Sequence, residues 1–376
     1  MSGIEILQLG DVCDFVYGKA LPSEIRSGEG FPVFGSNGVV GFHKEYLING
    51  PAIIVGRKGS YGEVNWSKEN CWAIDTTYYI RPKKQVDLKY LYYYLKVLDL
   101  KKINRSTAVP GLNREDVYPL KIHLTSFEQQ QKIATILGAA ESLIKLRKQA
   151  IAKLDELIES VFIEFFGDLN INNKNWEFRE LQYFADLSSG VTKGKKYNDS
   201  KVLSLPYMRV ANVQDGFLNL SEIKEISVSE KDAARYQLRK RDLLLTEGGD
   251  PDKLGRGAVW EEEVNNCIHQ NHIFRVRIEN ENLLNAYFLS KCTGSSYGKK
   301  YFLKMAKQTT GIATINMTQL KNFPVPLPPI DLQRKYETLI HEVQEQKRLM
   351  YDHLLKLQES FQSLLQRAFR GQLEIK

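Results

Sequence analysis

The sequence has few of the features that mark secreted, membrane-spanning or metal-binding proteins. Only 4 of its 376 residues are cysteine, and no two of them form a CxxC pair. This argues against a zinc knuckle and is typical of free thiols in a reducing cytoplasm, where we expect the protein to lie. The first apolar run is short and carries Glu5, and no window approaches 18 uncharged apolar residues. We therefore expect neither a signal peptide nor a membrane span.

Catalytic motifs are missing too. There is no GxxxxGK[ST] loop for ATP, and no glycine-rich loop with the Asn/Asp-Pro-Pro-aromatic site of a methyltransferase. Pro251–Asp252 and Glu261–Glu263 resemble a metal-dependent nuclease only superficially, because no ExK follows. The histidines of the HQNH stretch at 269–272 would fall on opposite faces of a strand. We predict no catalytic residue, no metal site and no cofactor in this chain.

The charge balance is mildly basic. The formal net charge is +7 and the sequence pI is near 8.9. That excess permits a polyanionic partner such as nucleic acid, but many basic proteins bind nothing acidic. Hydrophobic residues make up 43% of the chain, which is enough for packed cores, and the length suggests about two to three domains.

The chain repeats itself. LTSFEQQQKIATIL begins at Leu124 and LPPIDLQRKYETLI begins at Leu327, an offset of 203 residues. The same offset aligns Gln130 with Gln333. A fainter match lies upstream, where Leu9, Asp14 and Gly18 align with Leu181, Asp186 and Gly190. Each half therefore reads as a globular segment followed by a shorter helical one.

The helical segments carry a heptad seam. Apolar residues recur at alternating intervals of four and three, with Arg147 and Lys347 as polar exceptions. The main seam residues are Ile133, Leu137, Ile144, Ile151, Leu154 and Ile158, and Ile340, Val343, Leu354, Leu357, Phe361 and Leu364. A seam of some 33 residues makes a helix of about 50 Å, longer than a domain of this size. We predict that the two helices pair with each other; the alternative is two amphipathic helices packed on separate domains.

End signals bound these helices. Ser126 and Pro328–Pro329 stand where caps and N-terminal prolines are favoured, and Gly167 and Gly371 follow the last seam residues. The globular segments read as short strands with many turns and one helix each. The expected strands are 32–34, 52–55, 76–80, 203–210, 242–245 and 273–278, and the expected helices are 88–98 and 283–291.

Glycine-rich polar loops follow matching strands in the two halves. Residues 56–62 read GRKGSYG, and residues 247–257 read EGGDPDKLGRG. Their Arg and Lys side chains suit phosphates or guanine, their carboxylates suit cytosine, and the amides at 270–271 suit adenine. One such loop alone is better explained as a solvated turn, but two in register favour recognition. Asn113 and Asn316 read as caps instead. The candidate DNA-contacting residues are Lys19, Ser36, Asn37, Arg57, Lys58, Ser60, Tyr61, Lys193, Lys195, Lys196, Arg209, Asn212, Glu247, Asp250, Lys253, Arg256, His269, Gln270 and Asn271.

Several of these stretches together resemble the specificity subunit of type I restriction–modification systems. They are FEQQQKIATIL with its FFGD end, IDLQRKYETLI with its FRGQL end, VGRKGSYGEV, YMRVANVQDG, LLLTEGGDPDKLGRGAVW and HQNHIFRVR. The resemblance implies an α+β fold with two target-recognition domains, at 1–125 and 169–328. Two long spacer helices, at 126–168 and 329–376, would form an antiparallel coiled coil with pseudo-two-fold internal symmetry. Leu332 departs from the glutamine pair at Gln129–Gln130.

The resemblance also implies a function. The chain would be a non-catalytic subunit of a host-defence complex that reads a bipartite double-stranded DNA site. It would dock two modification (methyltransferase) subunits on its spacer, and restriction subunits for translocation and cleavage would join them. The alternative is a coiled-coil adaptor that binds only proteins.

Overall fold

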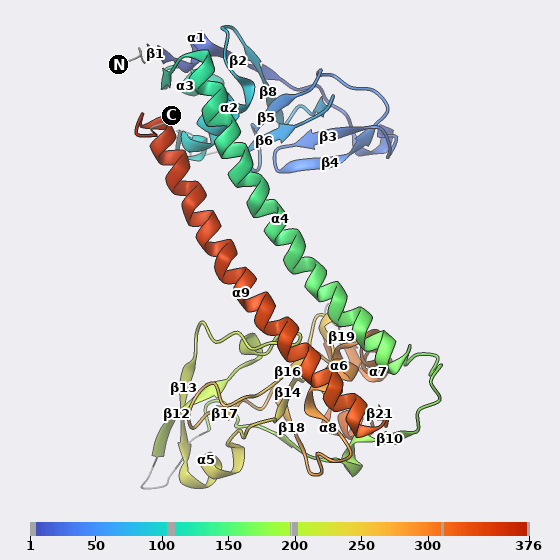
Figure 1. The fold of residues 1–376 in the computed structure, drawn as a ribbon. Helices are drawn as coiled ribbons and strands as arrows, with labels where there is room; N and C mark the ends of the chain where they lie inside the picture. The colour runs from blue at the N-terminus through green and yellow to red at the C-terminus, as the bar shows by residue number, and fades with distance from the viewer. Residues whose placement is uncertain (1–4, 104–109, 196, 198–201, 310–311, 374–376) are drawn as a thin grey trace. The chain divides into compact units, whose positions relative to one another are not determined.

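The computed structural model describes residues 5–103, 110–195, 197, 202–309 and 312–373, and it divides into two compact units (Figure 1). Unit 1 comprises Met1–Ala150 with Met350–Lys376, and unit 2 comprises Ile151–Leu349. Each of the two long helices, α4 (Phe127–Phe166) and α9 (Ile330–Phe369), has residues in both units. Neither helix therefore belongs to a single globular part of the chain.

Unit 1 is built on a four-stranded antiparallel sheet in the order β2-β8-β5-β6, beside a three-stranded sheet in the order β4-β3-β7. A further pair, β1-β9, closes the globular part. The bounds are β1 Glu5–Gln8, β2 Cys13–Tyr17, β3 Phe31–Gly35, β4 Gly38–His43, β5 Ala52–Gly56, β6 Val64–Ser67, β7 Trp72–Ala73, β8 Thr77–Pro82 and β9 Lys121–Leu124. The middle of the main sheet, β5, is buried along its whole length.

Unit 2 repeats this topology strand for strand. Its main sheet runs β11-β18-β14-β16, its second sheet runs β13-β12-β17, and β10 pairs with β21. It adds a small sheet, β15-β20-β19. The bounds are β10 Phe178–Glu180, β11 Ala185–Ser189, β12 Val202–Met208, β13 Lys224–Ser229, β14 Leu243–Thr246, β15 Gly248–Gly249, β16 Gly257–Val259, β17 Ile268–His269, β18 Ile273–Ile278, β19 Lys307–Thr309, β20 Ile312–Thr314 and β21 Pro324–Pro326. The faint upstream sequence match is thus a repeat of topology.

Short helices connect the strands. The α-helices are α1 Leu9–Val12, α2 Leu88–Val97, α3 Arg114–Val117, α5 Glu230–Tyr236, α6 Ala286–Gly294, α7 Ser296–Met305 and α8 Met317–Lys321. The 3-10 helices are η1 Ser23–Ile25, η2 Leu100–Ile103, η3 Leu181–Tyr183, η4 Val210–Asn212 and η5 Pro251–Lys253. Asn113 and Asn316 cap α3 and α8 as predicted. The predicted start of the last domain helix at 283 is wrong, because Asn285 accepts from the N–H groups of Tyr287 and Phe288 and starts α6 at Ala286.

The long helices begin and end as the end signals predict. Ser126 Oγ accepts from Gln129 N at 3.3 Å at the start of α4. Gly167 and Gly371 follow α4 and α9 with φ of +75° and +70°, a conformation in which glycine ends helices with little strain. All of the predicted seam positions are buried or half-buried. The heptad pattern therefore identifies the sheltered stripe of each helix.

In each unit, parts of both long helices join one apolar cluster. The unit 1 cluster contains Ile133 and Leu137 of α4 with Phe361 of α9. The unit 2 cluster contains Phe166 of α4 with Tyr336 of α9, whose ring centroids lie 5.4 Å apart. Residues of both long helices therefore contribute to the core of each unit.

The repeated glutamine anchors each long helix to the globular part of a unit. Gln130 is 2% exposed; its Nε2 donates to Thr125 O and its Oε1 accepts from Asp87 N, the residue that caps α2. Gln333 is fully buried, and its Oε1 accepts from Asn285 N, the residue that caps α6. A buried amide is costly unless its hydrogen bonds are made, so this geometry accounts for glutamine at both positions.

Within the described ranges, no helix is both long enough and apolar enough to cross a membrane. The four cysteines are buried free thiols.

Candidate nucleic-acid interface

In unit 1, loops from both sheets meet where β2, β3 and β5 end. Gly18 N donates to Thr77 O at 3.0 Å, Arg57 N donates to Thr76 O at 2.9 Å, and Ser36 Oγ donates to the same oxygen at 2.8 Å. A Cβ at Gly18 would overlap backbone carbonyl oxygens of residues 73 and 74, so only glycine allows this approach. The end of β2, the β3–β4 turn and the basic loop after β5 therefore form one surface.

A stack of charged and aromatic groups lies on this surface. The guanidinium carbon of Arg57 is 5.2 Å from the centroid of the Tyr17 ring, and that of Arg114 is 4.9 Å from it. Tyr17 is 48% exposed and packs against Tyr78 at 5.0 Å. Arg57 also donates from Nε and Nη2 to Asp75 O, at 3.2 and 2.8 Å. We call Tyr17, Arg57 and Arg114 the cation stack.

Unit 2 brings the matching segments together at the matching place. Val191 N donates to His269 O at 2.8 Å, Gln270 N donates to Met208 O at 3.0 Å, and Glu247 N donates to His272 O at 3.0 Å. Gly190, which aligns with Gly18, lies so close to His269 O that a Cβ would overlap it. The sequence match between the two glycines thus reflects one backbone requirement met twice.

The charged groups of unit 2 are paired differently from those of unit 1. Glu247 Oε2 lies 2.6 Å from His272 Nδ1, and Asp250 pairs with Lys253. The hydrogen bond from Lys253 lowers the pKa of Asp250. Arg256 donates from Nη2 to Val210 O at 3.5 Å, and its Nε is buried. A carboxylate–imidazole pair and a carboxylate–ammonium pair therefore occupy the loop after β14.

The structure divides the predicted contact residues by exposure. The exposed ones are Lys19, Asn37, Lys58, Ser60, Lys193, Lys195, Asp250 and Lys253. The half-buried ones are Arg57, Tyr61, Arg209, Glu247, Arg256, Gln270 and Asn271. Ser36, Asn212 and His269 are buried, and Lys196 lies outside the described residues. Three of the basic side chains are held by carboxylates: Lys195 pairs with Asp232 at 2.6 Å, Arg209 pairs with Glu222 at 2.9 Å, and Lys253 pairs with Asp250.

The three buried residues have structural roles that the sequence pattern did not indicate. Asn212 bonds to the backbone of Arg209, Asn219 and Glu222 and so closes η4. The Ser36 hydroxyl donates a hydrogen bond to Thr76 O. His269 is 0% exposed, and its Nδ1 donates to Tyr236 O at 3.1 Å. These side chains cannot reach a ligand from where they lie, so we leave them out of the proposal below.

Buried His269 predicts an acid-sensitive unit 2. Burial is the main cause that lowers the pKa of His269 from 6.5 to about 4; the hydrogen bond to Tyr236 O opposes it, and the charges of Arg275 and Arg277 add to it. The folded pKa lies below the unfolded one, so protonation favours the unfolded chain. The stabilisation is complete above pH 6.5 and is lost as the pH falls towards 4. Between pH 7 and pH 4.5 we expect this residue to remove about 2.5 kcal/mol of unfolding free energy, to be measured by urea denaturation.

Carboxylates titrate in the same window, so the measurement needs two reference variants. His269→Gln stays neutral and should lose about 2.5 kcal/mol less than the parent between these pH values. His353→Gln, at an exposed site on α9, should behave like the parent. Equal acid losses in the parent and His269→Gln would show that this imidazole does not cause the sensitivity.

The sequence interpretation missed three residues of the interface: Tyr17, Arg114 and His272. Tyr17 is the last residue of β2, and β11, its counterpart, ends in Ser189. A difference between repeats at an aligned strand end is a signal that could have identified it. No sequence signal identifies Arg114, because it reaches the stack through the tertiary fold.

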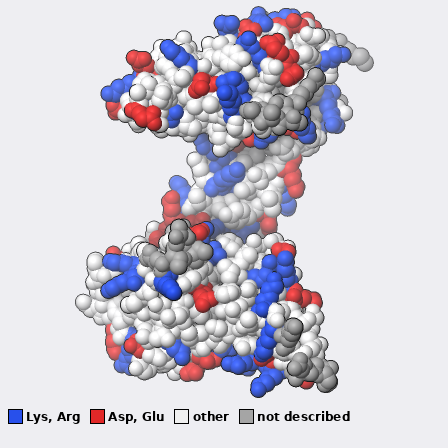
Figure 2. Space-filling model, turned by 180° about the vertical axis from the view of Figure 1, so that it is seen from behind, with Lys and Arg blue, Asp and Glu red and all other residues white. Residues whose placement is uncertain are grey.

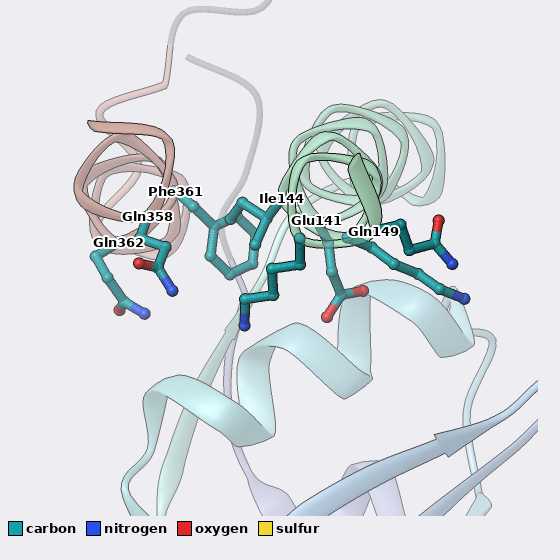
Figure 3. A pocket seen from close by; sticks show the side chains of 8 residues that line it. Glu141, Ile144, Gln149, Gln358, Phe361 and Gln362 are labelled. Atoms are coloured by element: carbon teal, nitrogen blue, oxygen red, sulfur yellow. The ribbon is translucent and has the colours of Figure 1, made fainter. Parts of the chain in front are cut away.

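Polar networks join the long helices to the globular part of each unit. In unit 1, Glu141 of α4 bonds to Tyr93 at 2.9 Å and Lys89 at 3.3 Å. Burial raises the pKa of Glu141, but Lys89 and Lys96 outweigh burial and hold it below its usual value. Figure 3 shows Ile144 of α4 next to Phe361 of α9 beside this carboxylate.

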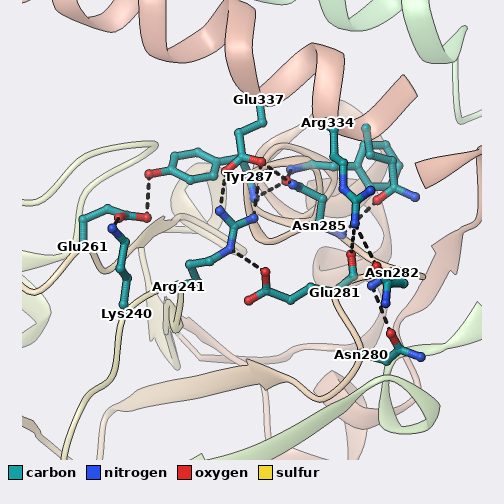
Figure 4. A network of polar contacts seen from close by, with 12 residues as sticks. Lys240, Arg241, Glu261, Asn280, Glu281, Asn282, Asn285, Tyr287, Arg334 and Glu337 are labelled. Atoms are coloured by element: carbon teal, nitrogen blue, oxygen red, sulfur yellow. Dashed lines mark hydrogen bonds and ion pairs between the residues drawn. The ribbon is translucent and has the colours of Figure 1, made fainter. Parts of the chain in front are cut away.

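Unit 2 has a network of the same kind around Glu337 of α9 (Figure 4). Glu337 pairs with Arg241, and Asn285 Nδ2 donates to it at 2.6 Å. Arg334 donates to Asn282 Oδ1 at 2.9 Å one turn earlier on α9. Burial raises the pKa of Glu337, but the hydrogen bonds from Arg241 and Asn285 outweigh it and the pKa is lowered. These contacts hold the first turns of α9 against the globular part of unit 2.

Charge is mixed over the face shown in Figure 2, where Lys and Arg are interspersed with Asp and Glu. Any recognition of an anion therefore depends on local clusters such as the cation stack. In the part of the chain that the structure describes, no three His, Cys, Asp or Glu side chains are grouped so as to hold a metal ion.

Comparison with known proteins gives consistent matches. The family model for the type I restriction modification DNA specificity domain matches residues 1–156 and 173–353. The putative MjaX specificity subunit of Methanocaldococcus jannaschii is 24% identical over 191 residues, covering 48% of this chain and 44% of that protein. The EcoBI specificity subunit of Escherichia coli is 28% identical over 360 residues, covering 87% and 75%. The chain thus spans under half the length of the first relative.

Solved structures agree in fold. The crystal structure of a type I restriction-modification S subunit from M. genitalium matches with a TM-score of 0.62 and 16% identity, covering 100% of this chain and 97% of that one. A chain from a study of complex assembly in the type I R-M system matches with a TM-score of 0.57 and 18% identity, covering 99% and 98%. At these identities, the likeness establishes the mixed α+β architecture.

Proposed function

Since this chain belongs to the type I restriction modification DNA specificity family, we propose that it is a non-catalytic, sequence-specific DNA-binding subunit. Each unit would read one half of a bipartite double-stranded site. The observation that carries the proposal is the twofold convergence of polar, charged loops at the same end of the same sheet topology. A protein that binds only other proteins has no need of two such surfaces. We place it in the cytoplasm, as part of a host-defence complex.

We further propose the four-part division expected from the sequence: recognition domains at 1–125 and 169–328, with spacer helices at 126–168 and 329–376. The shared apolar clusters support an antiparallel coiled coil. Two modification (methyltransferase) subunits would dock on the helices, joined by restriction subunits. Exposed apolar side chains support such docking; they include Leu143, Leu146, Leu157, Ile163, Leu339, Leu349 and Leu355. The contact residues we retain are the exposed and half-buried ones.

Salt dependence tests the proposal. With a modification subunit present, we expect the log of duplex-DNA affinity to fall steeply and linearly with log salt, because each neutralised phosphate contributes a slope of about −0.9. Arg57→Ala combined with Lys58→Ala should weaken binding and make the slope shallower by about one to two units. Binding is measured by fluorescence anisotropy at salt concentrations from about 50 to about 200 mM.

A charge-matched variant separates local contact from net charge. Lys44→Ala combined with Lys121→Ala also removes two positive charges, from other exposed positions in unit 1. It should leave the slope of log affinity against log salt unchanged. A flat salt dependence in the parent protein would count against DNA binding. If the parent bound no DNA while the parent and the Arg57/Lys58 variant assembled equally well, the adaptor function would be favoured instead.

A further inference from the structure

Tyr17 is an exposed aromatic residue that contacts Arg57 at the end of β2. We propose that it is a positioning residue, which holds Arg57 so that unit 1 can read a guanine in its half of the DNA site. This inference rests on the proposed function and adds to it one specificity-determining contact, with Arg114 as a second support.

The hydrogen bonds of Arg57 orient its guanidinium. Nε and Nη2 donate to Asp75 O, and the Tyr17 ring lies against the guanidinium face. Arginine has five N–H donors, so these contacts leave donors at the Nη1 side for a ligand. Among the described residues, no carboxylate forms an ion pair with this side chain. Two adjacent guanidinium N–H groups match the O6 and N7 acceptors of guanine, the commonest specific arginine contact.

The stack lowers the entropic cost of that contact. A free arginine loses considerable rotamer freedom when it binds, whereas one already held on an aromatic ring loses less. Arg114 occupies the stack from α3, where Nη1 also donates to Phe15 O at 3.4 Å. Arg114 also pairs with Glu115 at 3.3 Å, so Arg57 on the exposed Tyr17 ring and the exposed Lys58 supply the positive charge that an electronegative base edge would meet.

The internal repeat shows that the fold does not require the stack. Unit 2 has the same sheet order, yet its residues at the three aligned positions are Ser189, Glu247 and Met317. Glu247 is paired there with His272. A group needed for folding would be expected in both units, whereas a group that reads one half-site is expected in one. The two units should therefore read their half-sites by different chemistry.

Selection from a pool of random duplexes tests the inference on the full chain with its modification subunit. The parent protein should enrich a bipartite site with a guanine in one half. Tyr17→Phe keeps the ring and should keep that preference. Tyr17→Ala and Tyr17→Leu should reduce discrimination at that position about tenfold, within the roughly 5- to 150-fold that a bidentate arginine–guanine contact provides, and leave the other half-site unchanged.

Tyr17→Leu keeps apolar bulk, so it separates the cation–aromatic contact from packing. A merely structural role predicts that Leu behaves like Phe and that both half-sites weaken together; either result would overturn the inference. Tyr46→Ala is the matched control, since Tyr46 is 45% exposed and packs edge-on against Phe31 at 5.0 Å. If the parent enriched no sequence at all, the proposed function would fail first. If the parent read its site and Tyr17→Ala read it equally well, only this inference would fail.

Discussion

Replacing Asp242 with alanine is expected to lower the unfolding free energy of unit 2 by about 3–5 kcal/mol, the cost of leaving a buried charge without its partner. Asp242 is 0% exposed and receives two bonds of 2.7 Å from the Arg277 Nε and Nη2 atoms. The Arg239 N–H donates to the same carboxylate, also at 2.7 Å. Alanine would leave the largely buried Arg277 and one backbone N–H unsatisfied. Thermal and urea unfolding of the parent and variant measure the loss.

The repeat supplies the control. In unit 1 the arginine aligned with Arg277 is Arg81, and it pairs with Asp14 at 3.1 Å while its side chain is 65% exposed. Asp14→Ala removes this pair and a second solvent-screened pair with Lys83 at 2.8 Å, and should cost less than about 1 kcal/mol. If the two variants lost similar stability, burial would not be what makes the Asp242 pair matter. Asp242→Ala combined with Arg277→Met should recover part of the loss, because no buried charge is then left alone.

Removing seven residues from each long helix, 147–153 from α4 and 350–356 from α9, is expected to shorten the gap in the recognised DNA site. Seven residues at 1.5 Å each make about 10 Å, or roughly three base pairs at 3.4 Å each. The deletions keep the alternation of seam intervals, so the seam continues on the same face of both helices. Both half-site sequences should stay the same while their separation falls, as measured by mapping methylated positions.

Deleting the seven residues from α4 alone is the matched comparison. The helices would then differ by two turns, their seams could not both be satisfied, and we expect binding to the bipartite site to be lost. A gap that keeps its length after the double deletion would show that the helices do not set it, and the proposed spacer role would have to be abandoned.

The features that could be predicted best were those that recur at a regular spacing in the sequence. The heptad marked the sheltered stripe on both long helices, and the 203-residue offset led to two units of one topology. Ser126, Gly167 and Gly371 marked helix ends because capping depends on the local backbone. Residue type and spacing suffice for such features.

Features made by tertiary contacts could not be predicted in this way. His269 and Asn212 have residue types suited to DNA, but the strand register turns one inward and a tight 3-10 turn buries the other. Tyr17 and Arg114 meet across 97 positions of chain, a contact that no local pattern encodes. The exposed lysines were found readily because exposure is their default. Which of them contact DNA stays a prediction.

The division of each long helix between the units constrains the order of events during synthesis. Unit 2 is one uninterrupted stretch, Ile151–Leu349, so all of its residues emerge from the ribosome before Met350 does. Unit 1 needs Phe361 and Leu365 to complete its apolar cluster, so its first 150 residues are synthesised long before that cluster can be completed. A chain truncated after residue 349 should therefore contain a complete second unit and an incomplete first one.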